Sequence, residues 1–199
     1  MAGLFIVVDG PDGAGKTTVL RLLYESLSQK APVCLTAEPT RSPLGLEIRR
    51  ILRSGTAKER QALTDLFIED RAAHIREEIL PCLRTGGIVL CDRYKYSTVV
   101  YQQLQGEPRA LLVERSRDFL APDIAFILTL PDAGALLQRI RGRGGARECF
   151  ETREALEKII RYYDEMKDCF PSENIVFCRA GRPARNIAVE MLKKIDKTR

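Results

Sequence analysis

The sequence predicts a three-layer α/β/α fold around a parallel sheet of about five strands. Apolar runs of strand length recur along the 199 residues and are hydrophobic almost throughout, which is typical of strands covered on both faces. Segments with helical spacing separate these runs, and such alternation favours a parallel sheet with helices on both sides. The length and the hydrophobic content of 45% fit a single domain spanning residues 1–199.

The expected strands are five apolar runs, at Leu4 to Val8, Val33 to Leu35, Ile88 to Cys91, Ile124 to Leu130, and Ile175 to Cys178. The expected helices lie at Thr17 to Ser28, Gly45 to Leu52, Glu59 to Leu83, Ser97 to Leu104, Arg109 to Phe119, Ala133 to Ile140, Thr152 to Lys167, and Ala184 to Ile195. The segment from Arg139 to Arg147 has four arginines, three glycines and no acid. Because glycine disfavours a helix interior, we expect an inserted basic loop here, a lid spanning about residues 139–150.

Charge and cysteine content narrow the function classes. The chain has 32 Lys+Arg against 27 Asp+Glu, a net charge of +5, which suits an anionic ligand without requiring nucleic acid. Its six cysteines form no CxxC pair, so a zinc site is not expected. The start of the chain resembles neither a signal peptide nor a membrane span, and a cytoplasmic protein without a membrane partner is the expectation.

The segment Gly10 to Thr17 reads G-P-D-G-A-G-K-T and matches the phosphate-binding loop G-x-x-x-x-G-K-[ST] between a predicted strand and a predicted helix. Its glycines let backbone N–H groups turn inward toward phosphate oxygens, and the helix N-terminus adds positive potential. Lys16 is expected to reach the β- and γ-phosphates, and Thr17 to join the Mg²⁺ shell. The predicted ATP-binding residues are Gly10, Pro11, Asp12, Gly13, Ala14, Gly15, Lys16, Thr17 and Thr18.

A second carboxylate for Mg²⁺ is predicted at Asp92, which ends the apolar run beginning at Ile88. The alternative is that Asp92 caps the following helix. Asp9, at the end of the first strand, is a further candidate metal ligand. A P-loop fold that binds ATP with Mg²⁺ follows from these residues.

The acceptor of the phosphoryl group is indicated by Arg93, which directly follows Asp92 at the carboxyl edge of the sheet. A guanidinium there could bind a second phosphate in line with the γ-phosphate. The basic loop could close over both phosphates and exclude water, which separates a kinase from a hydrolase; the alternative is a solvated basic patch. The predicted catalytic residues are Lys16, Arg93, Arg141, Arg143 and Arg147.

When further motifs are considered together with the phosphate loop, the sequence resembles the thymidylate kinase family. The matching pieces are D-G-P-D-G-A-G-K-T-T at 9–18, E-P at 38–39, G-L-E-I-R at 45–49, L-F-I-E-D-R-A at 66–72, D-R-Y at 92–94 and S-T-V-V-Y-Q at 97–102. The resemblance implies transfer of the γ-phosphoryl group of ATP to dTMP, giving dTDP and ADP, with Mg²⁺ and in a homodimer.

The resemblance also implies residue roles. Phe67 and Arg71, four residues apart on one helix face, match the pair that stacks on thymine and hydrogen-bonds its carbonyl edge. The implied substrate-binding residues are Asp12, Glu38, Arg49, Phe67, Arg71, Arg93, Ser97, Thr98 and Tyr101. His74, one turn beyond Arg71, is expected to be a partly exposed structural residue. Gly13 stands where some members carry an arginine, which indicates the class whose catalytic arginine comes from the lid.

Two rival functions stay open. Glu38 could act as the base of a deoxynucleoside kinase that phosphorylates a neutral 5′-hydroxyl, although Arg49 and Arg93 would then lack an acceptor phosphate. The mild positive charge alone favours a nucleic-acid-associated ATPase, without a basic-aromatic stripe or a recognised module. A phosphomonoester has a second pKa of about 6, so a monophosphate acceptor needs no strong base.

Overall fold

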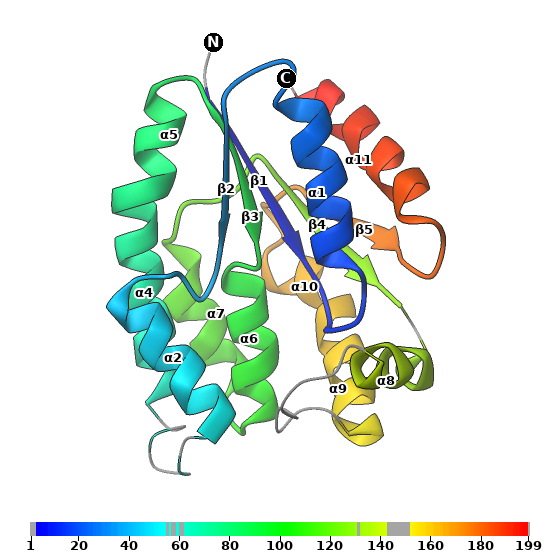
Figure 1. Ribbon diagram of the computed structural model, residues 1–199. Helices are drawn as coiled ribbons and strands as arrows, with labels where there is room; N and C mark the ends of the chain where they lie inside the picture. The colour runs from blue at the N-terminus through cyan, green and yellow to red at the C-terminus, as the bar shows by residue number, and fades with distance from the viewer. Residues whose placement is uncertain are drawn as a thin grey trace.

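The computed structural model confirms the predicted parallel sheet of five strands (Figure 1). It describes residues 3–54, 56, 59, 62–130, 132–142 and 152–198. The strands are β1 (Leu4–Asp9), β2 (Val33–Ala37), β3 (Ile88–Asp92), β4 (Ile124–Thr129) and β5 (Ile175–Arg179), and their order in the sheet is β2-β3-β1-β4-β5. All pairings are parallel, so the carboxyl ends of the strands meet at one edge.

Helices cover both faces of the sheet, which confirms the three layers. Along the chain they are α1 (Lys16–Leu27), α2 (Pro43–Ser54), α4 (Leu63–His74), the π-helical turn η1 (Ile75–Ile79), α5 (Leu80–Arg84), α6 (Lys95–Leu104), α7 (Arg109–Arg117), α8 (Ala133–Arg141), α9 (Arg153–Asp164), α10 (Met166–Cys169) and α11 (Ala184–Thr198). Helices α1 and α11 lie together on one face, and α5, α6 and α9 lie on the other (Figure 1). In the described part of the chain, no helix combines the length and apolar character needed to cross a bilayer.

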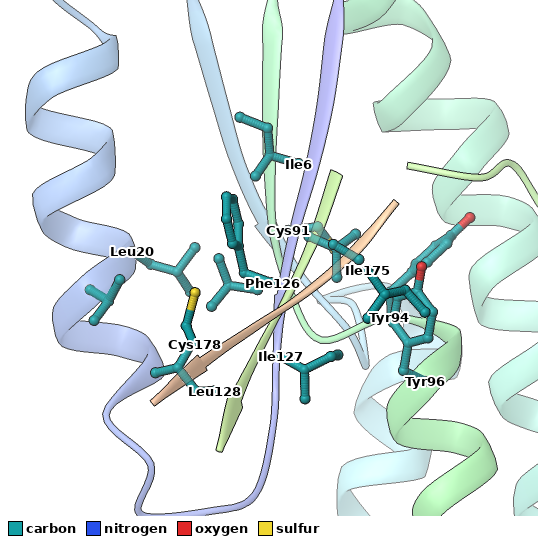
Figure 2. Packing of buried hydrophobic residues seen from close by; sticks show 14 of the residues in the cluster. Ile6, Leu20, Cys91, Tyr94, Tyr96, Phe126, Ile127, Leu128, Ile175 and Cys178 are labelled. Atoms are coloured by element: carbon teal, nitrogen blue, oxygen red, sulfur yellow. The ribbon is translucent and has the colours of Figure 1, made fainter. Parts of the chain in front are cut away.

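The hydrophobic core lies on both sides of the central strands (Figure 2). Leu20 of α1 packs on the side of Phe126, whereas Tyr94 and Tyr96 fill the opposite side. Strand β2 departs from the expected burial on both faces because it is an edge strand: its residues are only partly covered, and Leu35 is 50% exposed.

The helix expected from Glu59 to Leu83 is interrupted. It forms α4, then the π-helical turn η1, and then α5, in which Pro81 occupies the first turn. Proline lacks an N–H and its ring collides with the carbonyl four residues earlier. A wider π turn directly before Pro81 relieves that collision while the chain remains helical.

The first residues of the segment expected to form a basic loop are helical. Residues 139–141 continue α8, and Gly142 is its C-cap. The helix extends because Leu136 and Ile140 on its apolar side lie against the phosphate loop at Gly13. The remainder of the predicted lid, 143–150, lies outside the described residues.

Candidate active site

The phosphate loop joins β1 to α1 at the carboxyl edge of the sheet. Gly10 has φ 134°, and a Cβ there would lie 2.5 Å from the Leu128 carbonyl oxygen, so only glycine fits. Gly15, with φ 98°, is the N-cap of α1. The first backbone N–H groups of α1 therefore face the loop, the arrangement that binds phosphate.

Lys16 is buried at the first position of α1. Its Nζ donates hydrogen bonds to the carbonyl oxygens of Gly10 at 2.9 Å and Pro11 at 3.0 Å. Burial, with added repulsion from Arg93, lowers the pKa of Lys16 to about 8 despite nearby carboxylates. An anionic phosphate beside this group would favour its charged form.

The two candidate carboxylates for a metal differ sharply. Asp92 pairs in register with Val8 of β1, and within the described chain its buried Oδ1 has no hydrogen-bond partner. Burial raises the pKa of Asp92, although Lys16 and Arg93 oppose this effect. Asp92 and Thr17 line the same cavity, so the residue with the unpartnered oxygen lies beside the hydroxyl predicted to join the Mg²⁺ shell.

Asp9 does not fit the predicted metal role. Its Oδ1 accepts hydrogen bonds from the Gly10 N–H and from the hydroxyls of Ser97 and Tyr163, and its Oδ2 accepts from the N–H groups of Tyr94 and Ser97. A fully buried carboxylate with five donors has no lone pair left for a cation. Asp9 instead ties the start of the phosphate loop to the start of α6.

Arg93 has a left-handed backbone, φ 69°, and its guanidinium bonds to the phosphate loop and to α6. Nη2 donates to Asp12 Oδ1 and Nη1 donates to Ser97 Oγ at 2.8 Å. Its Cζ lies 5.2 Å from the centre of the Tyr101 ring, and Tyr101 donates to Asp12 Oδ2 at 2.9 Å. Partial burial alone would raise the pKa of Asp12, but Arg93 and Lys16 hold it well below its ordinary value.

Two cavities adjoin at Asp12 and Arg93. The first, about 180 Å³, lies on the phosphate loop and includes Lys16, Thr17 and Asp92. The second, about 260 Å³, lies between α2, α4 and α6, and the predicted acceptor-site residues among its lining are Asp12, Glu38, Arg49, Phe67, Arg71, Arg93, Ser97, Thr98 and Tyr101. Asp12, Glu38, Arg49 and Arg93 line both cavities. The structure therefore brings every predicted acceptor-site residue to one cavity beside the phosphate loop.

Arg71 lies fully buried at the wall of the second cavity. Its Nε and Nη2 donate to Glu38 Oε2 at 2.8 and 2.7 Å, and Nη2 also donates to Thr98 Oγ1 at 2.8 Å. Its Nη1 is buried and has no hydrogen-bond partner among the described residues. A buried guanidinium nitrogen left unpaired is costly, and Arg71 lines the cavity, so Nη1 is a candidate donor for an oxygen of a ligand.

His74 is buried, with 2% of its surface exposed, so the expectation of a partly exposed histidine is wrong. Its Nδ1 lies 3.0 Å from Glu38 Oε1 and its Nε2 lies 2.7 Å from Thr36 Oγ1. The burial arises because α4 places the ring toward β2, where these two polar partners replace water.

Arg49 on helix α2 lines the acceptor cavity. Asp70 on α4 holds the segment that leads into α2. Arg49 donates to the Pro39 carbonyl oxygen. Buried Asp70 accepts from the Thr40 N–H at 2.8 Å and from the Ser42 hydroxyl at 2.8 Å.

Arg53, one turn after Arg49, also lines the acceptor cavity. The sequence prediction missed it, although the i, i+4 spacing on one helix face was a usable signal.

The lid arginines are described only in part. Arg141 is exposed at the end of α8, whereas Arg143 and Arg147 lie outside the described residues. Arg139, not predicted as catalytic, donates to the Gly13 carbonyl oxygen at 3.4 Å. Tyr163 of α9, whose hydroxyl contacts Asp9 and Ser97, was also missed, and no local pattern marks it.

Comparison with known proteins agrees with this geometry. The family model described as thymidylate kinase matches residues 8–190. A probable thymidylate kinase from Pyrococcus horikoshii is 40% identical over 182 residues, 88% of each chain. A thymidylate kinase from Xanthomonas euvesicatoria is 41% identical over 157 residues, 78% of this chain and 69% of the relative, and one from Leptospira borgpetersenii is 37% identical over 175 residues, 86% and 83%. The chain belongs to the thymidylate kinase family.

Proposed function

We propose that this protein transfers the γ-phosphoryl group of ATP to dTMP, giving dTDP and ADP. The observation that carries the proposal is the pair of cavities that share Arg93 and Asp12. One cavity has the features of a triphosphate site and the other those of a nucleoside monophosphate site. A ligand in each would put the donor and acceptor phosphates next to each other at Arg93, so that the transfer is intramolecular in effect.

On the ATP side, Lys16 supplies the main positive charge. Its present bonds to the carbonyls of Gly10 and Pro11 hold the ammonium in the loop, from which it can turn to the β- and γ-phosphates. The magnesium ion expected with ATP would be held by the Thr17 hydroxyl and the Asp92 carboxylate, and it would neutralise charge on those phosphates. The partnerless Oδ1 of Asp92 supports this assignment.

On the acceptor side, the charged and aromatic residues of the cavity lining and the family resemblance favour a pyrimidine monophosphate. Arg49 and Arg93 bind the acceptor phosphate, and Phe67 stacks on the base. Arg71 uses its free Nη1 to donate to a base carbonyl. Tyr101 and Asp12, which are hydrogen-bonded to each other in the cavity lining, hold the deoxyribose.

The reaction needs no general base, and the contacts of Glu38 argue against the rival deoxynucleoside kinase. Both oxygens of Glu38 are engaged, one by Arg71 and the other by His74. A carboxylate held in this way is a poor proton acceptor for a 5′-hydroxyl, because accepting a proton would break a buried ion pair. The acceptor monophosphate is already largely dianionic at pH 7.

The test is a panel of acceptors with ATP and Mg²⁺. We expect ADP release with dTMP and little with thymidine. Turnover of dUMP should be slower but still measurable, because loss of a methyl group from an apolar pocket costs ~1–3 kcal/mol. Turnover of thymidine alone would favour the rival kinase. ATP hydrolysis stimulated by DNA, without a response to any monophosphate, would favour an ATPase.

Replacing Arg71 tests the acceptor assignment within the enzyme. Arg71→Ala should raise KM for dTMP by about 10-fold or more while KM for ATP stays near the wild-type value, since the lost hydrogen bonds involve a charged donor. Lys16→Ala serves as the comparison, because it should lower kcat severely. Equal effects of Arg71→Ala on both substrates would indicate a structural role instead.

The remaining assignments belong to the same proposal. Arg141, Arg143 and Arg147 supply lid charge to the transferring group, and their separate replacement by alanine would identify the one with the largest effect on kcat. The family resemblance supports a cytoplasmic homodimer, for which light scattering should give twice the chain mass of 22.4 kDa. A mass of one chain at micromolar concentration would exclude the dimer.

A further inference from the structure

His74 is a buried polar residue that the proposed reaction does not use. It is the last residue of α4 and is absent from the lining of both cavities. Its side chain is fully covered, yet both ring nitrogens have polar partners. A buried polar group whose hydrogen bonds are all satisfied specifies one local arrangement. The ring of His74 therefore fixes the side chains that it contacts.

The hydrogen-bond directions around the ring are set by its neighbours. Glu38 is a carboxylate, which only accepts, so Nδ1 must carry a hydrogen to bond its Oε1 at 3.0 Å. Nε2 lies 2.7 Å from Thr36 Oγ1 and 3.7 Å from Glu78 Oε2, and the Thr36 hydroxyl lies 2.9 Å from the same Glu78 oxygen. The Nδ1 donor toward Glu38 is therefore the contact that the neighbours of the ring require.

Glu38 is the link between His74 and the acceptor cavity. Its Oε2 receives two hydrogen bonds from Arg71, while its Oε1 bonds to His74. The terminal torsion of glutamate is broad, so the carboxylate plane needs an anchor on each oxygen. With both anchors in place, Arg71 is held by Nε and Nη2, and Nη1 stays free of protein partners among the described residues.

We propose that His74 is a positioning residue for acceptor recognition: it fixes Glu38, which in turn orients the Arg71 guanidinium toward the base of the acceptor. The inference rests on the proposed function and adds a residue that does not touch the substrate. It predicts that loss of the Nδ1 donor weakens acceptor binding and leaves ATP binding unchanged, because the contacts of His74 lead through Glu38 to Arg71, which lines the acceptor cavity and not the cavity on the phosphate loop.

Two amide substitutions separate the nitrogens of the ring. In His74→Asn the amide nitrogen takes the place of Nδ1 and can still donate to Glu38; in His74→Gln it takes the place of Nε2 and reaches Thr36 instead. We expect His74→Gln to raise KM for dTMP roughly 10-fold, the effect of about 1.4 kcal/mol, with KM for ATP and kcat within about twofold. His74→Asn should keep KM for dTMP within about threefold of wild type.

The outcomes distinguish the inference from the proposed function. A wild-type enzyme without dTMP turnover overturns the function and the inference together. An active wild type with equal KM values for dTMP in both variants, or with parallel changes for ATP, overturns the inference alone. Melting temperatures of the two variants show whether each is folded at the assay temperature.

A measurement on the unaltered protein keeps the inference testable if the variants fold poorly. The chain has a single histidine, so the imidazole ¹⁵N resonances of an untagged, labelled sample belong to His74 without assignment. We expect the ring nitrogen signals to shift on titration with dTMP and to stay in place with a non-hydrolysable ATP analogue. Ring signals that do not respond to dTMP would refute the coupling through Glu38.

Discussion

Lys16 is the residue whose ionisation should be visible in ATP binding. Its pKa in the free protein is lowered to about 8, mainly by burial, whereas bound phosphates favour the ammonium form. Above pH 8 the free protein must therefore take up a proton to bind ATP, and affinity should fall by about tenfold per pH unit. Isothermal titration of ATP between pH 7.5 and 9.5, in two buffers with different protonation enthalpies, measures both the affinity and the proton uptake.

The control for this prediction is Lys16→Arg. A guanidinium stays protonated throughout this window, so the slope of affinity against pH should disappear even if the affinity itself is lower. An ATP affinity of the wild type that does not change across the window would mean that Lys16 stays charged in the free protein.

At this scale the sequence predicted the residues that belong to continuous motifs. Lys16, Asp92 and Arg93 lie in short patterns whose chemistry is readable without a fold, and all three line the phosphate-binding cavity. His74 and Tyr163 could not be found in this way, because their partners lie 36 and 154 residues away in the chain. Their roles depend on tertiary contacts, as does the set of five donors that engages Asp9.

At the scale of elements, the contact between α8 and the phosphate loop depends on Gly13. Its φ is +81°, and a Cβ would lie 3.1 Å from the Leu136 carbonyl oxygen. We expect Gly13→Ala to destabilise the fold by ~1–3 kcal/mol, through backbone strain and crowding against α8, and to weaken ATP binding as the loop shifts. Urea unfolding and ATP titration measure the two effects.

Gly106 provides the matched control. It also has a positive φ, +101°, but a Cβ there would meet nothing within 4 Å. Gly106→Ala should therefore cost only the backbone strain and leave ATP affinity unchanged. If the two variants are equally stable and bind ATP equally well, α8 does not constrain the loop.

Element types followed from periodicity, whereas element ends did not. Continuous apolar runs predicted all five strands because buried parallel strands require such runs. The interruption at η1 and the longer α8 depend on Pro81 and on packing at Gly13. Pro81 is a local signal of the interruption, whereas the contact at Gly13 is tertiary and no local pattern contains it.

At the scale of the whole molecule, a buried ion pair connects the active-site helix to the far part of the chain. Lys95 of α6 lies 2.6 Å from Glu173 Oε1, and both side chains are buried. Tyr96 donates to the other oxygen of Glu173, and Lys95 Nζ lies 5.0 Å from the centre of the Phe170 ring. Residues just before β5 thereby brace the helix that carries Ser97 and Tyr101.

Glu173→Ala should lower the free energy of unfolding by about 3–5 kcal/mol, since it leaves the Lys95 ammonium buried without its counter-charge. Chemical denaturation measures this loss, and KM for dTMP, taken well below the melting temperature, should stay near that of the wild type because Glu173 lines neither the ATP nor the acceptor cavity. The double variant Lys95→Met/Glu173→Leu removes both charges and should recover most of the stability. Apolar side chains of similar size fill the site, and no unpaired charge remains buried. If the double variant were as unstable as Glu173→Ala, the contribution would come from the shape of the site and its bond to Tyr96, with the ion pair itself adding little.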